Sequence, residues 1–336
     1  MIRRFKRVPR FPAFPLMEDL VRPVRTAVAG VVLGVLALAG CGQTDDAATS
    51  AAPTPAASGS AVQGAFPVTV QAGNGAVTIA KRPERIVSLS PTATEILFAI
   101  GAGAQVTAVD DQSNYPPEAP RTNLSGFKPN VEAIAAAKPD LVVLANDLEG
   151  VVAGLGKVGV PVLLEPAATK LDDAYDQIRD LGAATGNTDK AEEVADGVKQ
   201  KLDALAAAVP KDKNLTYYHE LDTTPYAATS STFIGQVYSL FGLKNIADEA
   251  PDAAGGYPKL SAEFIAKADP DLIFLGDSKC CGQNAATLAK RPGWSGLTAV
   301  KKGHVVELDD DIASRWGPRV VDLAQAVSEA VRKAAS

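Results

Sequence analysis

Four side chains in this sequence have the chemistry to hold a large ligand, namely Tyr115, Tyr257, Arg315 and Trp316. The aromatic rings offer flat apolar faces to a conjugated molecule, and the tyrosines add a hydroxyl. The guanidinium of Arg315 can hold a carboxylate or a phosphate with two parallel hydrogen bonds. Each tyrosine could instead pack on its own part of the fold, and Arg315 could pair with an aspartate at 309–311. We expect Tyr115, Tyr257 and Arg315 to converge in one cleft.

No motif for catalysis accompanies these residues. The sequence has no nucleophile elbow, no phosphate-binding P-loop and no HExxH zinc motif. Its two histidines, His219 and His304, are too few for a histidine-rich metal site. The three successive aspartates at 309–311 cannot all reach one ion without a specialised loop, which favours a solvated turn. We therefore expect neither an enzyme nor a resident metal or cofactor.

Two adjacent cysteines, Cys280 and Cys281, follow a predicted strand at the same end as the other candidates. Thiols outside the cytoplasm tend to oxidise, so a disulfide between them is one alternative. Two packed free thiols are equally compatible with the sequence. A zinc or copper site would need more ligands than this loop supplies.

The N-terminus predicts export and attachment to a membrane. Seven of the 33 Lys and Arg residues lie within the first 25 residues, and an uncharged apolar run at 26–40 ends at Cys41. This run is too short to span a bilayer and is typical of a signal peptide. The ending Leu38-Ala39-Gly40-Cys41 resembles a bacterial lipobox, which implies that Cys41 becomes the lipidated first residue of the mature protein. An uncleaved anchor is the alternative.

The charge distribution argues against nucleic acid as a partner. The chain has a formal net charge of −6 although basic residues are concentrated at its N-terminus. The body that follows is therefore more acidic than the whole chain. Nucleic-acid binding needs a basic face, which this body does not offer.

An internal repeat predicts the fold. Beyond residue 80, short apolar runs alternate with amphipathic stretches, which is typical of an α/β fold with mostly parallel strands. Residues 130–145 and 261–276 share a capping residue, a helix, Pro-Asp and a buried strand at a constant offset of 131. Two related units imply two similar α/β lobes facing each other, with ligands bound beyond the carboxyl ends of the strands. The predicted strands are 86–89, 106–109, 141–144, 217–221, 271–275 and 304–308.

One long helix is predicted between the lobes. Apolar residues recur at helical spacing over 189–208, and Thr188 is a suitable N-cap. About twenty residues span about 30 Å, and such a rigid connection would let the cleft close little. The expected order is a signal peptide at 1–40, a disordered tether at 41–65, an N-terminal lobe at 66–187, the connecting helix at 188–210 and a C-terminal lobe at 211–336. A second helix is expected from Pro318, with Arg319 paired inside its own lobe.

Six segments carry a resemblance to a known family: Arg85–Glu95, Asn114–Ala119, Pro129–Glu132, Lys138–Leu141, Tyr257–Ser261 and Ser314–Arg319. In their order and spacing they resemble the helical-backbone substrate-binding proteins of ABC importers for iron(III)-siderophores, haem and vitamin B12. The similarity covers about residues 80–335. It implies two α/β lobes joined by one long helix. It also implies a monomer that delivers its ligand to an ABC permease dimer and reaches the membrane through its lipid anchor.

The resemblance leaves the ligand open. Vitamin B12-binding members carry a tryptophan at the end of the strand that matches 141–144, where this sequence has Ala145. This departure weakens a strict corrinoid interpretation and leaves siderophores and haem open. Haem iron usually takes a Tyr or His ligand. His219 could point to the cleft, although a structural role is favoured for a lone strand histidine.

Two glutamates at matching places in the repeat predict docking to the importer. Glu132 and Glu263 each stand two residues after a helix cap, Asn130 or Ser261. An acid in a first helical turn is stabilised by the helix dipole, which accounts for one of them. In the resembling family, acidic residues at these positions pair with arginines on the two permease subunits. We expect both side chains to be exposed.

The sequence thus predicts an extracytoplasmic, lipid-anchored solute-binding protein for an iron(III) chelate or a corrinoid. A cell-surface enzyme on the same two-lobed fold is the first alternative, against which the lack of a placed base or metal argues. A purely structural lipoprotein is the second, and it would not need Tyr257 and Arg315 at a shared rim.

Overall fold

The computed structural model describes residues 65–251 and 254–336. The predicted signal peptide, Cys41 and the predicted tether as far as residue 64 lie outside the described residues. Within the described part of the chain, no helix combines the length and the hydrophobicity that a membrane span requires.

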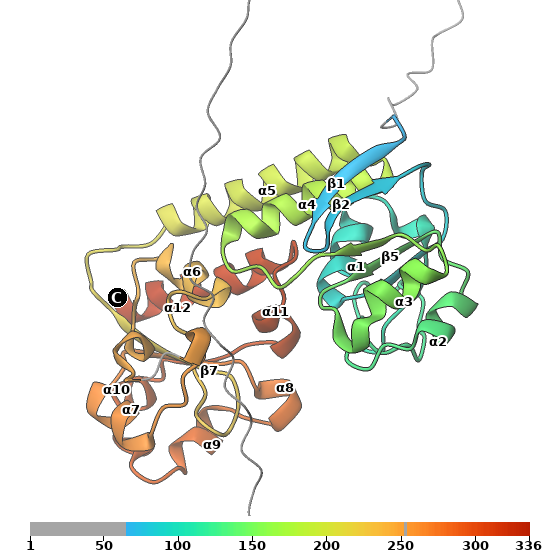
Figure 1. Cartoon of the computed structure of the whole chain (residues 1–336). Helices are drawn as coiled ribbons and strands as arrows, with labels where there is room; N and C mark the ends of the chain where they lie inside the picture. The colour runs from blue at the N-terminus through green and yellow to red at the C-terminus, as the bar shows by residue number, and fades with distance from the viewer. Residues whose placement is uncertain (1–64, 252–253) are drawn as a thin grey trace, which may run out of the picture. The chain divides into compact units, whose positions relative to one another are not determined.

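Two parallel four-stranded sheets form the framework (Figure 1). The N-terminal sheet has the order β4-β3-β5-β6 and the C-terminal sheet the order β10-β9-β7-β8. In both, the first strand lies between the second and the third, so the two sheets have the same topology. Their strands are β3 (Ile86–Leu89), β4 (Val106–Val109), β5 (Leu141–Leu144), β6 (Val162–Leu164), β7 (Thr216–Glu220), β8 (Lys244–Asn245), β9 (Leu272–Leu275) and β10 (Val305–Glu307).

The central strands are buried along their whole length, as strands of parallel sheets covered on both faces must be. Every residue of β3, β5 and β9 is buried. The short runs rich in Val, Ile and Leu therefore predicted these strands correctly. Strands β3, β4 and β5 have the predicted bounds. The α/β fold class and the two parallel sheets agree with the sequence prediction.

The internal repeat is visible in the backbone. Helix α2 (Val131–Ala136) and helix α7 (Ala262–Ala268) precede β5 and β9, again at an offset of 131. Asn130 and Ser261 cap these helices, and each side chain accepts a hydrogen bond from the third helical N–H. Lys138 and Asp269, also 131 residues apart, both adopt a left-handed backbone conformation after their helices.

The connecting helix α5 (Thr188–Ala207) packs on α4 (Leu171–Thr185) and on α12 (Val320–Ala335) (Figure 1). Its N-cap is Asn187, one residue before the predicted Thr188, because Gly186 ends α4 in a left-handed conformation and the chain turns directly into α5. Likewise α12 begins at Val320 rather than at the predicted Pro318, with Arg319 at the cap.

One hydrophobic core spans both lobes. It joins the inner faces of the two sheets, for example Ile86 of β3 and Phe274 of β9, through α5 residues such as Leu202. Two smaller clusters cover the outer faces, one behind each sheet. Because a close-packed interior resists deformation, this shared core supports the expectation of limited lobe closure.

An antiparallel hairpin precedes the N-terminal sheet and was not predicted. Strands β1 (Val68–Ala72) and β2 (Gly75–Ile79) are joined by a two-residue turn. The Asn74 side chain donates to the carbonyl of Val162 and accepts from the N–H of Leu164, so it ties the hairpin to β6. The alternating pattern around this short turn is a hairpin signal that could have revealed it.

The remaining elements are short and surround the two sheets. The helices are α1 (Pro91–Ala99), α3 (Val151–Lys157), α6 (Phe233–Ser239), α8 (Ser278–Cys281), α9 (Ala285–Ala289), α10 (Thr298–Lys301) and α11 (Asp310–Ser314). The 3-10 turns are η1 (Gly103–Gln105), η2 (Leu148–Gly150), η3 (Ile246–Glu249), η4 (Ala254–Gly256) and η5 (Trp294–Gly296).

Candidate ligand-binding site

A cavity of about 380 Å³ lies at the carboxyl edge of the N-terminal sheet. The wall from the N-terminal lobe is formed by residues that directly follow β3, β4 and β5, including Ser90, Asp110 and Ala145. The other wall comes from α11 and the residues after it, including Arg315 and Trp316. The cavity therefore lies where parallel α/β sheets bind ligands, and both lobes line it.

Arg315 is held in place by four hydrogen bonds. It is 9% exposed, and one terminal nitrogen donates to Glu95 (2.8 Å) and to the Asn114 side chain (2.9 Å). The other donates to the Gln112 carbonyl (3.0 Å) and to Asp311 (2.8 Å). Arg315 thus lines the cavity as predicted, but its nitrogens are bonded to protein groups, including one of the three aspartates considered as its partner.

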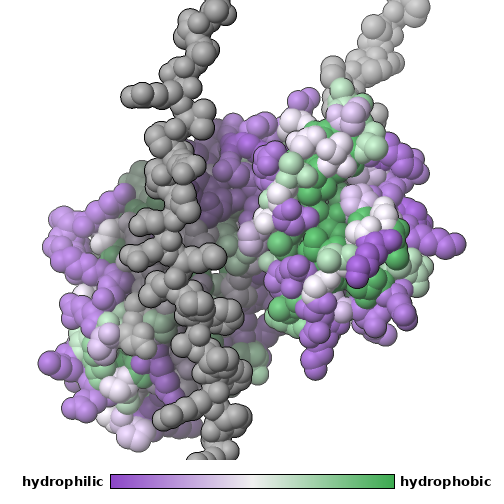
Figure 2. All heavy atoms as spheres, in the orientation of Figure 1, coloured by the Kyte–Doolittle hydropathy of each residue, from purple (hydrophilic) through white to green (hydrophobic). Residues whose placement is uncertain are grey.

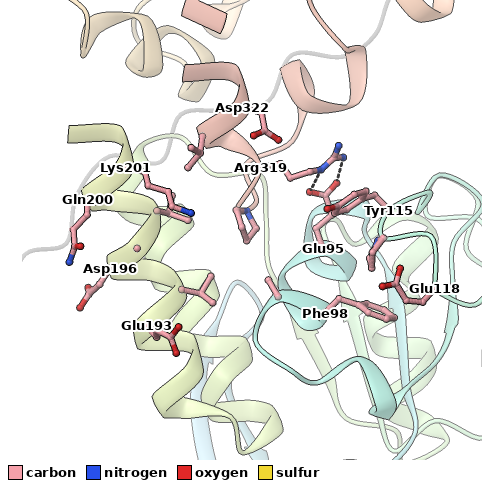
Figure 3. Close-up of a pocket in the computed structure, with 17 residues that line it drawn as sticks. Glu95, Phe98, Tyr115, Glu118, Glu193, Asp196, Gln200, Lys201, Arg319 and Asp322 are labelled. Atoms are coloured by element: carbon pink, nitrogen blue, oxygen red, sulfur yellow. Dashed lines mark hydrogen bonds and ion pairs between the residues drawn. The ribbon is translucent and has the colours of Figure 1, made fainter. Parts of the chain in front are cut away.

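Glu95 on α1 also forms an ion pair with a second arginine of the C-terminal lobe. The Arg319 side chain donates two hydrogen bonds to its carboxylate, at 2.9 and 2.6 Å, drawn as dashed lines in Figure 3. The prediction that Arg319 pairs inside its own lobe is therefore wrong. Because α12 begins only at Val320, Arg319 lies at the helix cap, from which it reaches across to α1.

Tyr115 lies beside this ion-pair network rather than in the cavity with Arg315. The guanidinium carbon of Arg319 lies 4.1 Å from the centre of the Tyr115 ring. Tyr115 lines a second cavity, of about 830 Å³, between α1, α5 and α12 (Figure 3). Tyr115 and Arg315 therefore line different cavities, and Tyr257 lines neither of the two. The convergence of all three in one cleft stays a prediction.

Trp316 follows Arg315 and also lines the 380 Å³ cavity. Its indole N–H donates to the Gln177 side chain at 2.8 Å, which connects it to α4. A bonded indole has a fixed orientation, so the ring can serve as a stable wall for a flat ligand.

Four of the exposed large hydrophobic residues are aromatic, and all four lie in loops outside the sheets. They are Tyr115, Phe127, Tyr226 and Tyr257. Phe127, which is 69% exposed, lines the 380 Å³ cavity. Tyr226 follows β7 and pairs through a β-bridge with Lys259, two residues after Tyr257. Sequence reasoning missed Phe127 and Tyr226, although their positions after β4 and β7 could have revealed them.

Gly256 fixes the turn that carries Tyr257. Its φ of +99° is in the left-handed region, and an added Cβ would approach the Thr232 methyl to 2.7 Å. The Thr229 N–H donates to the Gly256 carbonyl at 2.8 Å. A larger residue at this position would displace the loop, and Tyr257 with it.

The carboxyl edge of the C-terminal sheet is held by an ion pair within the lobe. Glu220, the last residue of β7, is buried and accepts two hydrogen bonds from Arg291, both at 2.6 Å. Asp277, after β9, is also buried, and neither of its carboxylate oxygens has a hydrogen-bond partner in the described part of the chain. Burial, followed by the nearby charge of Glu220, raises the pKa of Asp277 to about 7.

The two cysteines form a vicinal disulfide in α8, which was one of the two alternatives. The backbone N–H groups of Lys279 and Cys280 both donate to the Asp310 carboxylate. The aspartates at 309–311 are therefore not a solvated turn. They cap α8 and α11 and pair with Arg315 and Lys279. Among the described residues, no group of acids, histidines and cysteines is arranged to hold a metal ion.

His219 lies in the core and does not reach the cavity. It is buried on β7, and its Nδ1 is 2.8 Å from the Tyr238 hydroxyl. Burial lowers its pKa to about 4, so the ring is neutral at physiological pH. The structural role favoured for this histidine is what the structure shows.

The sequence matches a known family along most of its length. A family model described as periplasmic binding protein matches residues 86–312. The chain belongs to this family. Its members are extracytoplasmic substrate-binding proteins of ABC transporters for iron, haem and vitamin B12 rather than enzymes. The two parallel sheets agree with the two-lobed fold of such binding proteins.

Individual relatives agree with this assignment. The chain is 31% identical to the uncharacterized ABC transporter substrate-binding lipoprotein YvrC of Bacillus subtilis, covering 90% of this chain and 95% of that protein. It is 33% identical to the cobalamin-binding protein of Halobacterium salinarum, covering 76% and 72%. The crystal structure of a possible iron-binding periplasmic solute-binding protein from Staphylococcus epidermidis superposes with a TM-score of 0.64 at 27% identity, covering 75% and 99%.

In this binding protein, the two glutamates of the repeat are solvent-exposed. Glu132 and Glu263 lie in the first turns of α2 and α7. Neither belongs to an ion pair with any residue that the structure describes. Both carboxylates are therefore accessible to a partner. Figure 2 shows hydrophilic residues over much of the visible face, around patches of hydrophobic ones.

Proposed function

We propose that this protein captures a corrinoid or an iron(III) chelate outside the cytoplasmic membrane and delivers it to an ABC importer. The observation that carries the proposal is the cavity at the carboxyl edge of the N-terminal sheet, which both lobes line and which Phe127 and Trp316 flank. Exposed aromatic rings are unfavourable in water, and a ligand that covers them removes this cost. A flat, conjugated molecule or a compact metal chelate is such a ligand.

A corrinoid is the first candidate. The cobalamin-binding protein of Halobacterium salinarum is 33% identical to this chain. Phe127 and Trp316 at the cavity, with Tyr226 and Tyr257 in loops of the other lobe, offer several rings for contact with a large macrocycle. The two lobes share one core, which supports a rigid cleft that accepts a large ligand without extensive closure.

An iron(III)-siderophore is the second candidate, and Ala145 is the observation that favours it. This residue lines the cavity directly after β5, where the resemblance to vitamin B12-binding members implies a tryptophan. A methyl group there leaves room for a bulkier, rounder chelate. Haem is less well supported, because none of the described residues lining this cavity is a Tyr, His, Cys or Met, the side chains that bind haem iron.

Native mass spectrometry tests the ligand class. We expect the purified protein to retain one molecule of cobalamin or of a ferric siderophore from a mixture that also contains haem. Retention of haem alone would replace both candidates. Retention of none of the three would contradict the proposed function.

We further propose that Cys41 carries the lipid anchor. The apolar run that ends at Cys41 supports this, as does the likeness to the lipoprotein of Bacillus subtilis. The substitution Cys41→Ser should move the protein from the membrane fraction to the soluble exterior fraction. Unchanged retention in the membrane fraction would instead indicate an uncleaved anchor.

Docking to the two permease subunits is assigned to Glu132 and Glu263. One exposed, unpaired carboxylate per lobe suits a permease with two similar subunits, and acidic groups steer the protein toward basic pockets. The double variant Glu132→Ala with Glu263→Ala should abolish uptake while ligand affinity stays within about twofold of wild type. The matched control is Glu118→Ala with Glu329→Ala, which also removes one exposed glutamate per lobe. Normal uptake by the first variant, or equal loss in the control, would contradict the assignment.

A further inference from the structure

We propose that Asp110 selects ligands that present an N–H donor and rejects ligands that present a carboxylate. The inference rests on the proposed function, because it concerns the same cavity. It adds which hydrogen-bonding group the bound ligand presents to the cavity wall. The donor can be a peripheral carboxamide of a corrinoid or an ammonium group of a ferric chelate.

Asp110 is an unsatisfied acceptor at the cavity wall. It follows β4, is 3% exposed and lines the 380 Å³ cavity. Its Oδ1 has no hydrogen-bond partner among the residues that the structure describes. A buried oxygen without a donor costs free energy, which a donor on the ligand would recover.

The position of the carboxylate is fixed by its surroundings. The Asp110 N–H donates to the Ser88 carbonyl at 3.0 Å, and its carbonyl accepts from the Ser113 N–H at 3.2 Å. Gly126 lies so close that an added Cβ would be 2.7 Å from Asp110 Oδ2 and 2.8 Å from the Leu89 carbonyl. The glycine therefore lets the 126–127 segment close over Oδ2. Asp110 cannot turn away without disturbing that segment.

Among the described residues that line the cavity, Arg315 is the one cation, and it is already engaged by other groups. Arg315 lines the same cavity, but its terminal nitrogens already donate to Glu95, Asn114, Gln112 and Asp311. Asp311 also lines the cavity, but its charge is balanced by Arg315 and Lys279. A ligand carboxylate would therefore meet the charge of Asp110, whereas an N–H group would meet an acceptor that lacks a donor.

The contact between Asp110 and a ligand N–H also makes ligand affinity depend on pH in a defined direction. Burial raises the pKa of Asp110, and its interactions with Ser113 oppose the rise. The charge of Asp111 adds to the rise, and that of Arg315 opposes it. A ligand N–H bonds best to the ionised carboxylate. Affinity should therefore strengthen as the pH rises through the pKa of Asp110.

Isothermal titration of the purified protein tests the inference with three probes. They are cyanocobalamin, a cobalamin derivative with one peripheral carboxamide hydrolysed to a carboxylate, and a ferric trihydroxamate that carries a free ammonium group. The variants are Asp110→Asn, which keeps the shape, and Asp110→Ala, which removes the acceptor. Asp111→Asn is the matched control, because Asp111 is the exposed neighbour and does not line the cavity.

We expect Asp110→Ala to weaken binding of the amide- or ammonium-bearing probe at least tenfold and Asp111→Asn to change it less than twofold. We expect Asp110→Asn to remove the pH dependence and to narrow the preference for the amide over the carboxylate derivative. Wild-type affinity that does not vary with pH, together with Asp110 variants that bind like wild type, would overturn the inference and leave the proposed function standing. A wild-type protein that binds neither cobalamin nor the ferric chelate would overturn the proposed function itself. Circular dichroism of each variant separates lost binding from lost folding, and the wild-type pH series requires no variant.

Discussion

The two sheets have the same strand order, yet their carboxyl edges differ. At the N-terminal edge, residues after β3, β4 and β5 border a cavity, and Asp110 Oδ1 has no hydrogen-bond partner within 65–251 and 254–336. At the C-terminal edge, Glu220 is bonded twice by Arg291, and the disulfide-containing α8 is held by Asp310. The repeated topology therefore does not dictate a repeated site. One edge keeps polar groups for a ligand, whereas most charges at the other are paired within the lobe.

The C-terminal lobe reaches the cavity through α11, which follows the end of β10, and through the residues after α11. Arg315 and Arg319 on this segment both bond to Glu95 of the N-terminal lobe. Of the three residues in this buried network, Arg315 lines the cavity, so the network holds that part of the cavity wall in place. Substitutions in this network and at the carboxyl edge of the C-terminal sheet test whether the two edges differ in this way.

The largest effect is expected from Glu95→Gln. Glu95 is buried and is the shared partner of two arginines, so loss of its charge leaves both without full compensation. Removing one partner of a buried ion pair typically costs about 3–5 kcal/mol. Urea denaturation should show a loss of this size in the free energy of unfolding. The exposed Glu118→Gln should change it by about 0.5 kcal/mol or less, and a loss below about 1 kcal/mol for Glu95→Gln would show that the network is not what joins the lobes.

A smaller, pH-dependent effect is expected from Asp277→Asn at the C-terminal edge. The pKa of Asp277 is about 7 in the folded protein against an ordinary value of 3.8. Its contribution to stability is therefore fully present below about pH 4 and is lost as the pH rises through 7. At pH 8 the variant should be more stable than wild type by roughly 1–3 kcal/mol, because wild type then carries a buried negative charge beside Glu220 whereas the amide is neutral. Denaturation at pH 4 and pH 8 measures this, and an equal difference at both values would contradict the assigned pKa.

The smallest effect is expected from reduction of the Cys280–Cys281 disulfide. A bridge between adjacent residues closes almost no loop, so it constrains the unfolded chain very little. Reduction, or the double variant Cys280→Ser with Cys281→Ser, should change the free energy of unfolding by less than about 1 kcal/mol. Ligand affinity should stay within about twofold, because neither cysteine lines the cavity. A large loss of affinity would place α8 in the ligand site and weaken the contrast between the edges.

Sequence patterns predicted the features that depend on residues close together in the sequence. Apolar runs located the buried strands, and the offset of 131 located matching helices with their caps at Asn130 and Ser261. The lipid anchor at Cys41 stays a prediction, because it lies outside the described residues.

Sequence patterns failed where distant residues determine the contact. Arg319 and Glu95 are 224 residues apart in the sequence, and Glu220 and Arg291 are 71 apart. No local pattern signals such pairs. The unsatisfied Oδ1 of Asp110 likewise depends on the assembled sheet rather than on neighbouring residues.

The central claim is that the ligand binds in the cavity that both lobes line, and Trp316 reports on it directly. The chain has two tryptophans: Trp294 is buried in the C-terminal lobe, and Trp316 lines the cavity. In a Trp294→Phe variant, the fluorescence of Trp316 can be followed as cyanocobalamin or a ferric siderophore is added. We predict saturable quenching with a stoichiometry of one ligand per protein. Stoichiometric binding by mass spectrometry without any change in Trp316 fluorescence would contradict the claim and place the ligand elsewhere.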